Sequence, residues 1–169
     1  DQTVNIYSAF LQNEWKNDRW GILIGGRLDK HNMVDNVIFS PRANLRFNPT
    51  QNINLRLSYS SGFRAPQAFD EDMHIENVGG TVAMIERAKN LKEEKSQSFS
   101  ASADMYHRFG VFQTNFLIEG FYTRLTDVFV LGEPYDRGDG ILVKTRSNGP
   151  GAKVMGLTLE GKVAYLSIL

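Results

Sequence analysis

The fold is decided by residues 53–60, Ile-Asn-Leu-Arg-Leu-Ser-Tyr-Ser, in which apolar and polar side chains alternate at every position. Successive side chains of a β-strand point to opposite faces, so this stretch has one apolar face and one polar face. Residues 42–47, Arg-Ala-Asn-Leu-Arg-Phe, show the same alternation. Both stretches are therefore predicted to be amphipathic strands.

Segments with this period recur along the chain and are separated by turn residues, which is typical of barrel strands. About seven strands are expected in an all-β fold. The segments are residues 4–15, 20–29, 42–47, 53–60, 98–105, 112 to about 131, and about 141 to 165. No apolar run reaches the roughly 18 residues that a spanning helix needs, so a transmembrane helix is excluded.

Three places depart from strict alternation. Phe10 falls among the polar positions of its segment, and Leu117 and Phe121 interrupt the polar face of theirs. A bulge, or a cluster that fills the interior of a barrel, would explain the latter two. The run Asn148-Gly149-Pro150-Gly151 interrupts the last segment, where proline disfavours one continuous central strand.

Short and long connections alternate. The short ones are residues 16–19, 48–52 and 110–111, and the long ones are residues 30–38, 64–95 and 132–140. Outer-membrane barrels have short periplasmic turns and longer extracellular loops, so the pattern predicts an orientation. Trp15, Trp20, Phe109 and Phe112 flank two of the short turns, as an aromatic girdle at that membrane interface requires. Cross-strand aromatic pairs in ordinary hairpins are the alternative.

Composition mainly excludes functions. The 19 basic and 19 acidic side chains balance, so no electrostatic footprint points to nucleic acid. Absence of cysteine excludes disulfides and thiolate metal sites. The three histidines, His31, His74 and His107, have no metal-ligand spacing, and no nucleophile elbow or dinucleotide fingerprint is present. We therefore expect no enzyme activity and no cofactor. No signal peptide is visible at Asp1, so the chain is expected to be either processed or a fragment.

Residues 60–67, Ser-Ser-Gly-Phe-Arg-Ala-Pro-Gln, resemble a signature of TonB-dependent receptors, in which a barrel strand ends in Gly-Phe-Arg-x-Pro and continues into an extracellular loop. Asn90-Leu91-Lys92-Glu93-Glu94-Lys95-Ser96 resembles the family's Asn-Leu-Lys-Pro-Glu-x-Ser, with Glu93 where proline is common. Further segments resemble family motifs and occur in the family's order, so that together the motifs span nearly the whole chain. Upstream these are residues 10–15, 26–29 and 40–42, and downstream they are residues 121–127 and 156–161.

The resemblance implies an antiparallel up-and-down transmembrane β-barrel of about 22 strands with a plug in its lumen. Residues 1–169 would be an internal part of that single barrel domain, with a long extracellular loop at about 64–95. The plug and its energy-coupling box are not visible in this chain. A short helix is expected within the long loop, because Val82, Ile85 and Ala88 are spaced at a helical period after Gly79-Gly80.

The same resemblance implies a receptor in the bacterial outer membrane that imports a scarce nutrient, such as an iron-siderophore complex, haem, cobalamin or a glycan. Its expected partners are outer-membrane lipid, its own plug domain, the small nutrient, and the TonB energy-coupling complex, which acts through the missing plug. A passive porin or barrel adhesin is the first alternative. A soluble all-β binding domain, built as a sandwich, is the second.

Candidate site residues fall into two groups. The lumen-facing and plug-contacting candidates are Arg27, Arg42, Asn44, Arg46 and Arg56, opposite the lipid-facing Leu45, Leu55 and Leu57. The ligand-binding candidates in the loop and upper lumen are Arg64, Gln67, Asp70, Asp72, His74 and Asn77. Arg64 suits a bidentate contact with a carboxylate or phosphate, although a clamp between loop and strand is the favoured interpretation. Asp70, Glu71 and Asp72 offer oxygen ligands for calcium, but a solvated acidic loop is the simpler interpretation.

Overall fold

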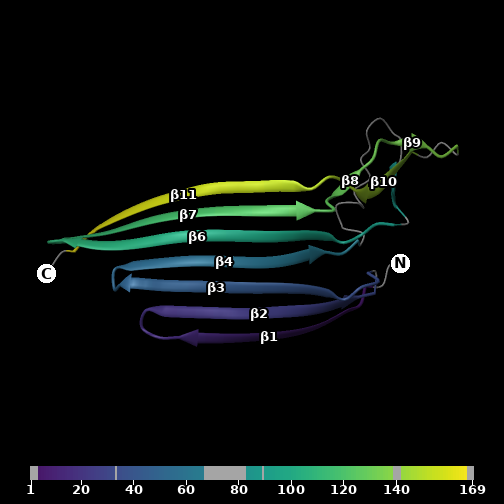
Figure 1. Cartoon of the computed structure of the whole chain (residues 1–169). Helices are drawn as coiled ribbons and strands as arrows, with labels where there is room; N and C mark the ends of the chain where they lie inside the picture. Colours follow the sequence, from purple (N-terminus) through teal and green to yellow (C-terminus); the bar gives the residue numbers. More distant parts are fainter. Residues whose placement is uncertain (1–3, 33, 67–82, 89, 139–141, 167–169) are drawn as a thin grey trace.

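The computed structural model describes residues 4–32, 34–66, 83–88, 90–138 and 142–166. All regular elements in these ranges are β-strands (Figure 1). In chain order they are β1 Ile6–Lys16, β2 Trp20–His31, β3 Ile38–Thr50, β4 Ile53–Arg64, β5 Ala83–Arg87, β6 Glu94–Phe109, β7 Phe112–Thr126, β8 Phe129–Leu131, β9 Tyr135–Asp136, β10 Leu142–Asn148 and β11 Ala152–Tyr165. Within the described residues, no helix is long and apolar enough to cross a membrane.

Seven long strands form one antiparallel sheet in the order β1-β2-β3-β4-β6-β7-β11. Each strand pairs with the next long strand along the chain, which is an up-and-down meander (Figure 1). The strands have 11 to 16 residues, about twice the usual five or six in globular proteins. The expected all-β architecture with seven barrel strands is therefore confirmed.

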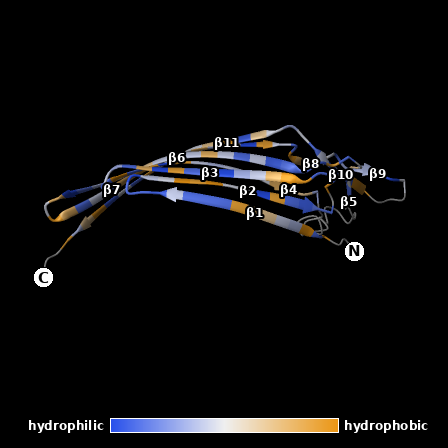
Figure 2. Cartoon of the chain, turned by 60° about the horizontal axis from the view of Figure 1, so that its bottom comes forward, coloured by the Kyte–Doolittle hydropathy of each residue, from blue (hydrophilic) through white to orange (hydrophobic). Residues whose placement is uncertain are grey.

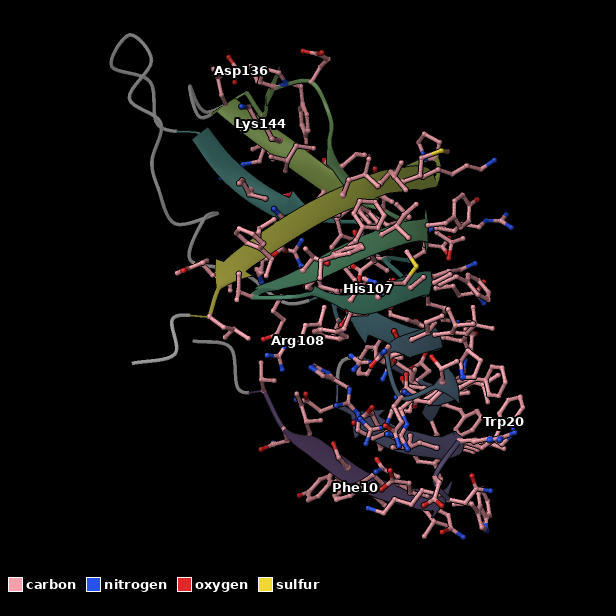
Figure 3. All side chains as sticks on the ribbon, turned by 90° about the vertical axis from the view of Figure 1, so that its left-hand side faces the viewer. Phe10, Trp20, His107, Arg108, Asp136 and Lys144 are labelled. Carbon is pink, nitrogen blue, oxygen red and sulfur yellow. The ribbon has the colours of Figure 1, made fainter. Side chains whose placement is uncertain are left out.

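The register gives the sheet one apolar and one polar face. A continuous row of cross-strand partners on the apolar face runs across β2 to β11 and consists of Ile22, Leu45, Leu57, Ala101, Gly120 and Leu157. One position further along, a row on the polar face contains Leu23, Asn44, Ser58, Ser100, Phe121 and Gly156. Hydropathy accordingly alternates along the strands in Figure 2. Phe10 and Trp20 lie on opposite sides of the sheet (Figure 3), as their alternation predicts.

The short connections lie at one end of the sheet. Gly110 and Val111 join β6 to β7, and Gly110 has a φ of 57°. Positive φ at the first central position alone is typical of a type II′ turn. At the β1–β2 turn, the Asn17 side chain accepts hydrogen bonds from the backbone N–H groups of Arg19 and Trp20, at 3.0 and 2.8 Å. The predicted alternation of short and long connections is present along the described chain.

One strand boundary differs from expectation. The segment from Phe112 leaves the main sheet at Thr126, because Asp127 adopts a left-handed conformation with a φ of 53°. The last segment divides after Asn148, as the predicted interruption at Asn148-Gly149-Pro150-Gly151 indicates, and only β11 belongs to the main sheet. β8 and β10 instead join a second, small sheet in the order β5-β10-β8, with β9 also paired to β10. Local alternation marks a strand but does not indicate which sheet it joins.

The prediction of a short helix in the long loop is wrong for the residues that can be described there. Ala83–Arg87 forms β5, which pairs in parallel with Leu142–Arg146 of β10. Backbone hydrogen bonds to β10 replace those that a helix would form internally, so tertiary pairing overrides a weak helical period. The small sheet lies beyond one end of the long strands (Figure 1).

The polar-face residues Leu117 and Phe121 do not mark a bulge. β7 keeps one register with β6 from Phe112 to Thr126, and with β11 from Phe112 to Leu125. The Phe121 ring lies over Gly156, where a Cβ atom would be 2.5 Å from the ring edge. Glycine at this position therefore leaves room for an aromatic side chain on an otherwise polar face.

Few of the described residues form a buried core. The one buried apolar cluster of the described residues consists of Val34, Ile38 and Ala65 with Phe63 packed on it, beside the end of the sheet where the long connections lie. Many large apolar residues of the main sheet are exposed, and Leu11, Leu57 and Leu157 are more than half exposed. An apolar face of this extent requires an apolar environment or a covering partner.

Candidate functional site

The predicted lumen-facing residues share the polar face. Arg42, Asn44 and Arg46 alternate along β3, and Arg42 pairs in register with Gly25 and Ser60. The Arg42 guanidinium donates a hydrogen bond to the Gln12 side-chain carbonyl. Arg56 lies directly opposite Arg46, and its Nε donates to Asn54 Oδ1 at 2.9 Å. Two of these guanidinium groups, those of Arg42 and Arg56, are therefore bonded to neutral amides.

An ion pair between the half-exposed Arg27 and the buried Asp29 lies on the same face near the long connections. Asp29 is 2% exposed and accepts hydrogen bonds from Arg27 Nε at 2.7 Å and from Ser8 Oγ at 2.5 Å. Its register partner Ser8 belongs to β1, so the carboxylate links the first two strands. Because a buried charge is costly without partners, Arg27 has a structural task as well as its place on the polar face.

Arg64 ends β4 next to its register partner Glu94. Both contact Phe129 of β8, since the Arg64 guanidinium carbon lies 5.9 Å from the ring centroid and Glu94 Oε2 accepts the Phe129 N–H at 3.0 Å. These contacts hold the small sheet against the ends of β4 and β6. They agree with the interpretation of Arg64 as a clamp between loop and strand.

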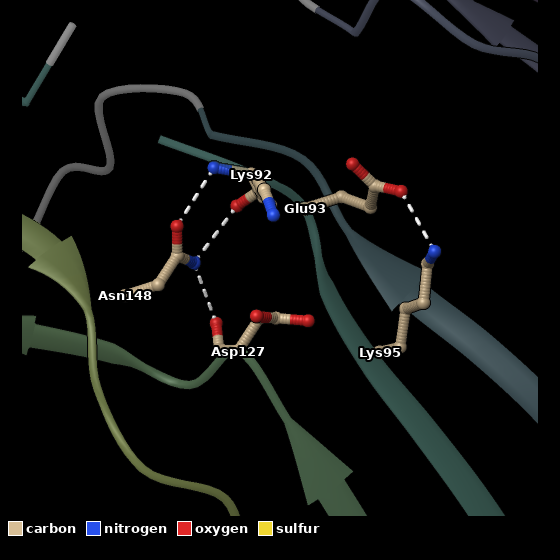
Figure 4. Close-up of polar contacts among 5 residues, drawn as sticks. All are labelled: Lys92, Glu93, Lys95, Asp127 and Asn148. Atoms are coloured by element: carbon tan, nitrogen blue, oxygen red, sulfur yellow. Dashed lines mark hydrogen bonds and ion pairs between the residues drawn. The ribbon is translucent and has the colours of Figure 1, made fainter. Parts of the chain in front are cut away.

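The Asn148 side chain links the two longest connections, one between β4 and β6 and the other between β7 and β11, at the ends next to the main sheet (Figure 4). Its Nδ2 donates to the backbone carbonyls of Lys92 at 3.0 Å and Asp127 at 2.7 Å, and its Oδ1 accepts the Lys92 N–H at 2.8 Å. One amide thus satisfies three backbone groups from segments that precede β6 and follow β7. Beside it, Lys95 Nζ forms a salt bridge with Glu93 at 3.0 Å.

The small sheet joins these two longest connections into one unit. β5 comes from the connection after β4, whereas β8, β9 and β10 come from the connection after β7. Val143 of β10 is completely buried, and Glu86 forms a salt bridge with Arg137 at 3.4 Å. Because Ala88 N–H also donates to the Arg146 carbonyl at 2.9 Å, the pairing continues past the end of β5.

The remaining ligand-binding candidates, Gln67, Asp70, Asp72, His74 and Asn77, lie outside the described residues, as do the calcium candidates with Glu71. Among the residues that the structure does describe, no three His, Cys, Asp or Glu side chains converge as a metal site would require. Arg64 is therefore the only member of the ligand-binding group that the structure places.

Sequence reasoning missed several structural contacts. Asp29 belongs to the motif at residues 26–29, and an acid two positions after Arg27, on the same face of a predicted strand, was a usable signal. The sequence marks Asn148 only as part of a break in the alternation. No local signal identifies the partners of Asn148, because its bonds reach residues distant in the sequence.

An aromatic band marks the short-turn end of the apolar face. Trp20 stacks on Phe47 with ring centroids 4.2 Å apart, and Phe112 packs against Tyr165 at 5.6 Å. Trp15 and Phe109 lie on the same face and are more than half exposed. The band thus contains cross-strand pairs and also has the position required of a girdle.

Solved structures of this architecture include the siderophore receptor PirA from Pseudomonas aeruginosa, with a TM-score of 0.72 and 18% identity over 94% of this chain and 30% of that one. The ferric enterobactin receptor PfeA from the same organism has a TM-score of 0.69 and 20% identity, over 92% of this chain and 24% of that one. The FrpB iron transporter from Neisseria meningitidis has a TM-score of 0.66 and 17% identity, over 97% and 24%.

The chain thus spans less than a third of the length of each of these proteins. At such low identities the likeness shows the fold alone. No curated protein is significantly similar in sequence. Residues 1–168, however, match the family described as TonB dependent receptor-like, beta-barrel. That match covers nearly every residue and agrees with the motifs at 60–67 and 90–96, so the chain belongs to the TonB-dependent receptor β-barrel family.

Proposed function

We propose that this chain is part of an outer-membrane receptor and transporter, which binds a scarce nutrient outside the cell and imports it with energy from TonB. The observation that supports this most is the seven-stranded sheet with one apolar and one polar face. Strands of 11 to 16 residues equal or exceed the length of about 9–11 residues that crosses a bilayer at a tilt. Family membership supplies the link from this sheet to nutrient uptake.

In this proposal the apolar face meets outer-membrane lipid, and the polar face lines the lumen. The short connections lie at the periplasmic side, with the aromatic band at that interface. The small sheet, formed by the two longest connections, lies on the extracellular side. Residues 1–169 are then an internal part of one barrel domain, and a plug elsewhere in the intact protein contacts the polar face and couples to TonB.

Iron-siderophore complexes are the first candidates among nutrients, because the three solved structures are named as siderophore or iron receptors and transporters. Haem, cobalamin and glycans remain alternatives within the family. Arg64, Gln67, Asp70, Asp72, His74 and Asn77 are the proposed ligand contacts. A soluble sandwich is less well supported, since no second sheet covers the apolar face among the described strands. A passive porin or adhesin does not account for the family match.

Spin labels in the intact protein test the orientation of the faces. Labels at Leu45, Leu55 and Leu57 are expected to report lipid contact in the outer membrane, whereas labels at Asn44 and Arg56 are not. Reversed contact would overturn the assignment of the two faces.

Uptake measurements test the transport function. Cells that express the intact protein are expected to accumulate labelled iron from ferric siderophores under iron limitation, and to lose this uptake when TonB is absent. Uptake that does not need TonB would favour a passive porin. No uptake of any of the four nutrient classes, from a barrel that assembles normally, would overturn the proposal.

A further inference from the structure

A group of basic residues lies on the apolar face of the main sheet, at the end next to the small sheet. Arg124 of β7 and Lys153 of β11 are direct cross-strand partners, and Gln97 of β6 is the partner of Arg124 on its other side. Lys95 follows on the same face of β6, with Thr126 as its partner. The side chains of Arg124, Lys153 and Lys95 are all exposed. Three cations therefore gather where this face ends.

These cations end a long uncharged stretch of the face. Every second residue of β7 between Phe112 and Arg124 is uncharged, and so are their partners on β11. At a rise of about 3.3 Å per residue and a strand tilt of about 40°, the 12 residues from Phe112 to Arg124 span roughly 30 Å across the membrane. The hydrocarbon core of a bilayer has about this thickness. With the aromatic band at one interface, Arg124 and Lys153 therefore lie at headgroup level on the other.

The charges of Arg124 and Lys153 are not compensated within the described chain. Neither residue forms a salt bridge with another described residue. Lys95, by contrast, is paired with Glu93 at 3.0 Å (Figure 4). Like charges at directly opposite positions destabilise a strand pair unless a counter-charge is close. Arg124 and Lys153 therefore suit an anion that approaches from the membrane side.

An apolar groove of about 1070 Å³ adjoins the cations on the same face. Its floor contains Ala101 and Gly120, which are direct cross-strand partners with little or no side chain. Larger side chains also line the groove, namely Leu57, Phe99, Tyr122, Met155 and Leu157. Because Tyr122 precedes Arg124 by two residues on the same face, the groove leads directly to the cations.

We propose that Arg124 and Lys153 bind the phosphate of a phosphorylated lipid in the outer leaflet, whose acyl chain occupies the apolar groove. The inference rests on the proposed function, in which this face meets lipid and the small sheet is extracellular. A guanidinium fork matches two phosphate oxygens, and the lysine ammonium adds a second positive charge. Gln97 and Thr126 offer neutral hydrogen-bonding groups on the same face.

The position of the cations favours a lipid over a free phosphate ion. A free ion at this level would lose water without gaining any apolar contact. A lipid headgroup is already at the height of Arg124, and its acyl chain covers apolar surface of the groove, which adds to the free energy of binding. The adjoining groove and cations therefore fit an amphipathic anion.

Lipid binding to the purified intact protein tests this proposal. Native mass spectrometry measures the affinity for diphosphorylated lipid A and for the same lipid without its phosphates. The site variant combines Arg124→Gln with Lys153→Gln. The matched control combines Arg108→Gln with Lys162→Gln, which removes two positive charges from the polar face of β6 and β11.

The unmodified protein is expected to prefer the phosphorylated lipid. The site variant is expected to lose roughly 25-fold in affinity for it, because each basic residue at an anionic lipid surface contributes about fivefold. The control variant is expected to bind like the unmodified protein. Equal affinities for the two forms of the lipid, or equal losses in the two variants, would overturn the inference. Displacement of the lipid by an equal concentration of inorganic phosphate would also overturn it, in favour of a site for the free ion.

The spin label at Leu57 separates this result from failure of the proposed function. A label at Leu57 without lipid contact would mean that the apolar face does not meet the membrane, and both proposals would fall. Lipid contact at Leu57, together with no preference for the phosphorylated lipid, would leave the receptor assignment intact and remove only the headgroup site.

Discussion

The seven-stranded sheet and the small sheet at its end are stabilised in different ways. In the large sheet every strand pairs with the next long strand along the chain, and an extended apolar face remains exposed. In the small sheet, segments from two different connections meet through a parallel pair, and Val143 is completely buried. The large sheet therefore depends on what surrounds it, whereas the small sheet depends on packing and on hydrogen bonds at its base.

This difference also concerns assembly. Antiparallel neighbours joined by two or three residues form with little loss of chain entropy. Pairing of β5 with β10 requires residues distant in the sequence to meet, so it is expected to follow formation of the long strands. Substitutions should accordingly affect the two regions separately.

The largest expected effect is that of Leu57→Arg, which places a charge at the centre of the apolar face. In the lipid-facing orientation this costs about 2–4 kcal/mol near the bilayer midplane. Ser58→Arg is the control, because Ser58 is the adjacent residue on the polar face. Denaturant unfolding of the intact barrel in bilayers measures the loss of unfolding free energy in each variant. Equal losses from the two substitutions would contradict the distinction between the faces.

Val143→Ala tests whether the small sheet has a packed interior of its own. Removing two buried methyl groups is expected to cost roughly 2 kcal/mol, and the loss should be confined to the small sheet. Hydrogen exchange should accelerate at amides of β5 and β8 while those of β3 and β4 stay protected. Acceleration throughout the main sheet would show that the two regions unfold together.

Asn148→Ala tests the base of the small sheet. The substitution removes hydrogen bonds to Lys92 and Asp127, with an expected net loss of about 1–2 kcal/mol because these partly exposed groups regain water. Limited proteolysis should cut the connection after β7 faster while the barrel still assembles. Asn36→Ala, in an exposed connection, is the control. An unchanged rate of proteolysis would show that Asn148 does not stabilise the base of the small sheet.

The smallest expected effect is that of Gly156→Ala within the main sheet. Its new Cβ would be 2.5 Å from the Phe121 ring, which has to rotate away at a cost of about 1 kcal/mol. Gly161→Ala on the same strand meets nothing within 4 Å and is expected to be neutral or slightly stabilising. The difference in unfolding free energy between the two variants measures the contact. A smaller loss of unfolding free energy for Gly156→Ala than for Gly161→Ala would contradict close packing of Phe121 over Gly156.

Most of the large sheet was predictable because its order is local. Period-two alternation assigns Leu45, Leu55 and Leu57 to one face and Asn44 and Arg56 to the other, and short turns leave neighbouring strands no alternative partner. The candidate site was less predictable. Alternation places Arg27, Arg42 and Arg46 on the polar face, but the contacts of Asp29 with Ser8 and of Arg42 with Gln12 depend on the arrangement of different strands.

Residue order alone predicts the long strands, their two faces and the family, because each follows from the pattern within one hairpin or motif. The three-dimensional arrangement was needed to show that Ala83–Arg87 is a strand, that β7 ends at Thr126, and that Asn148 joins two connections. These features depend on hydrogen bonds between segments far apart in the chain, whose free energy no local pattern contains.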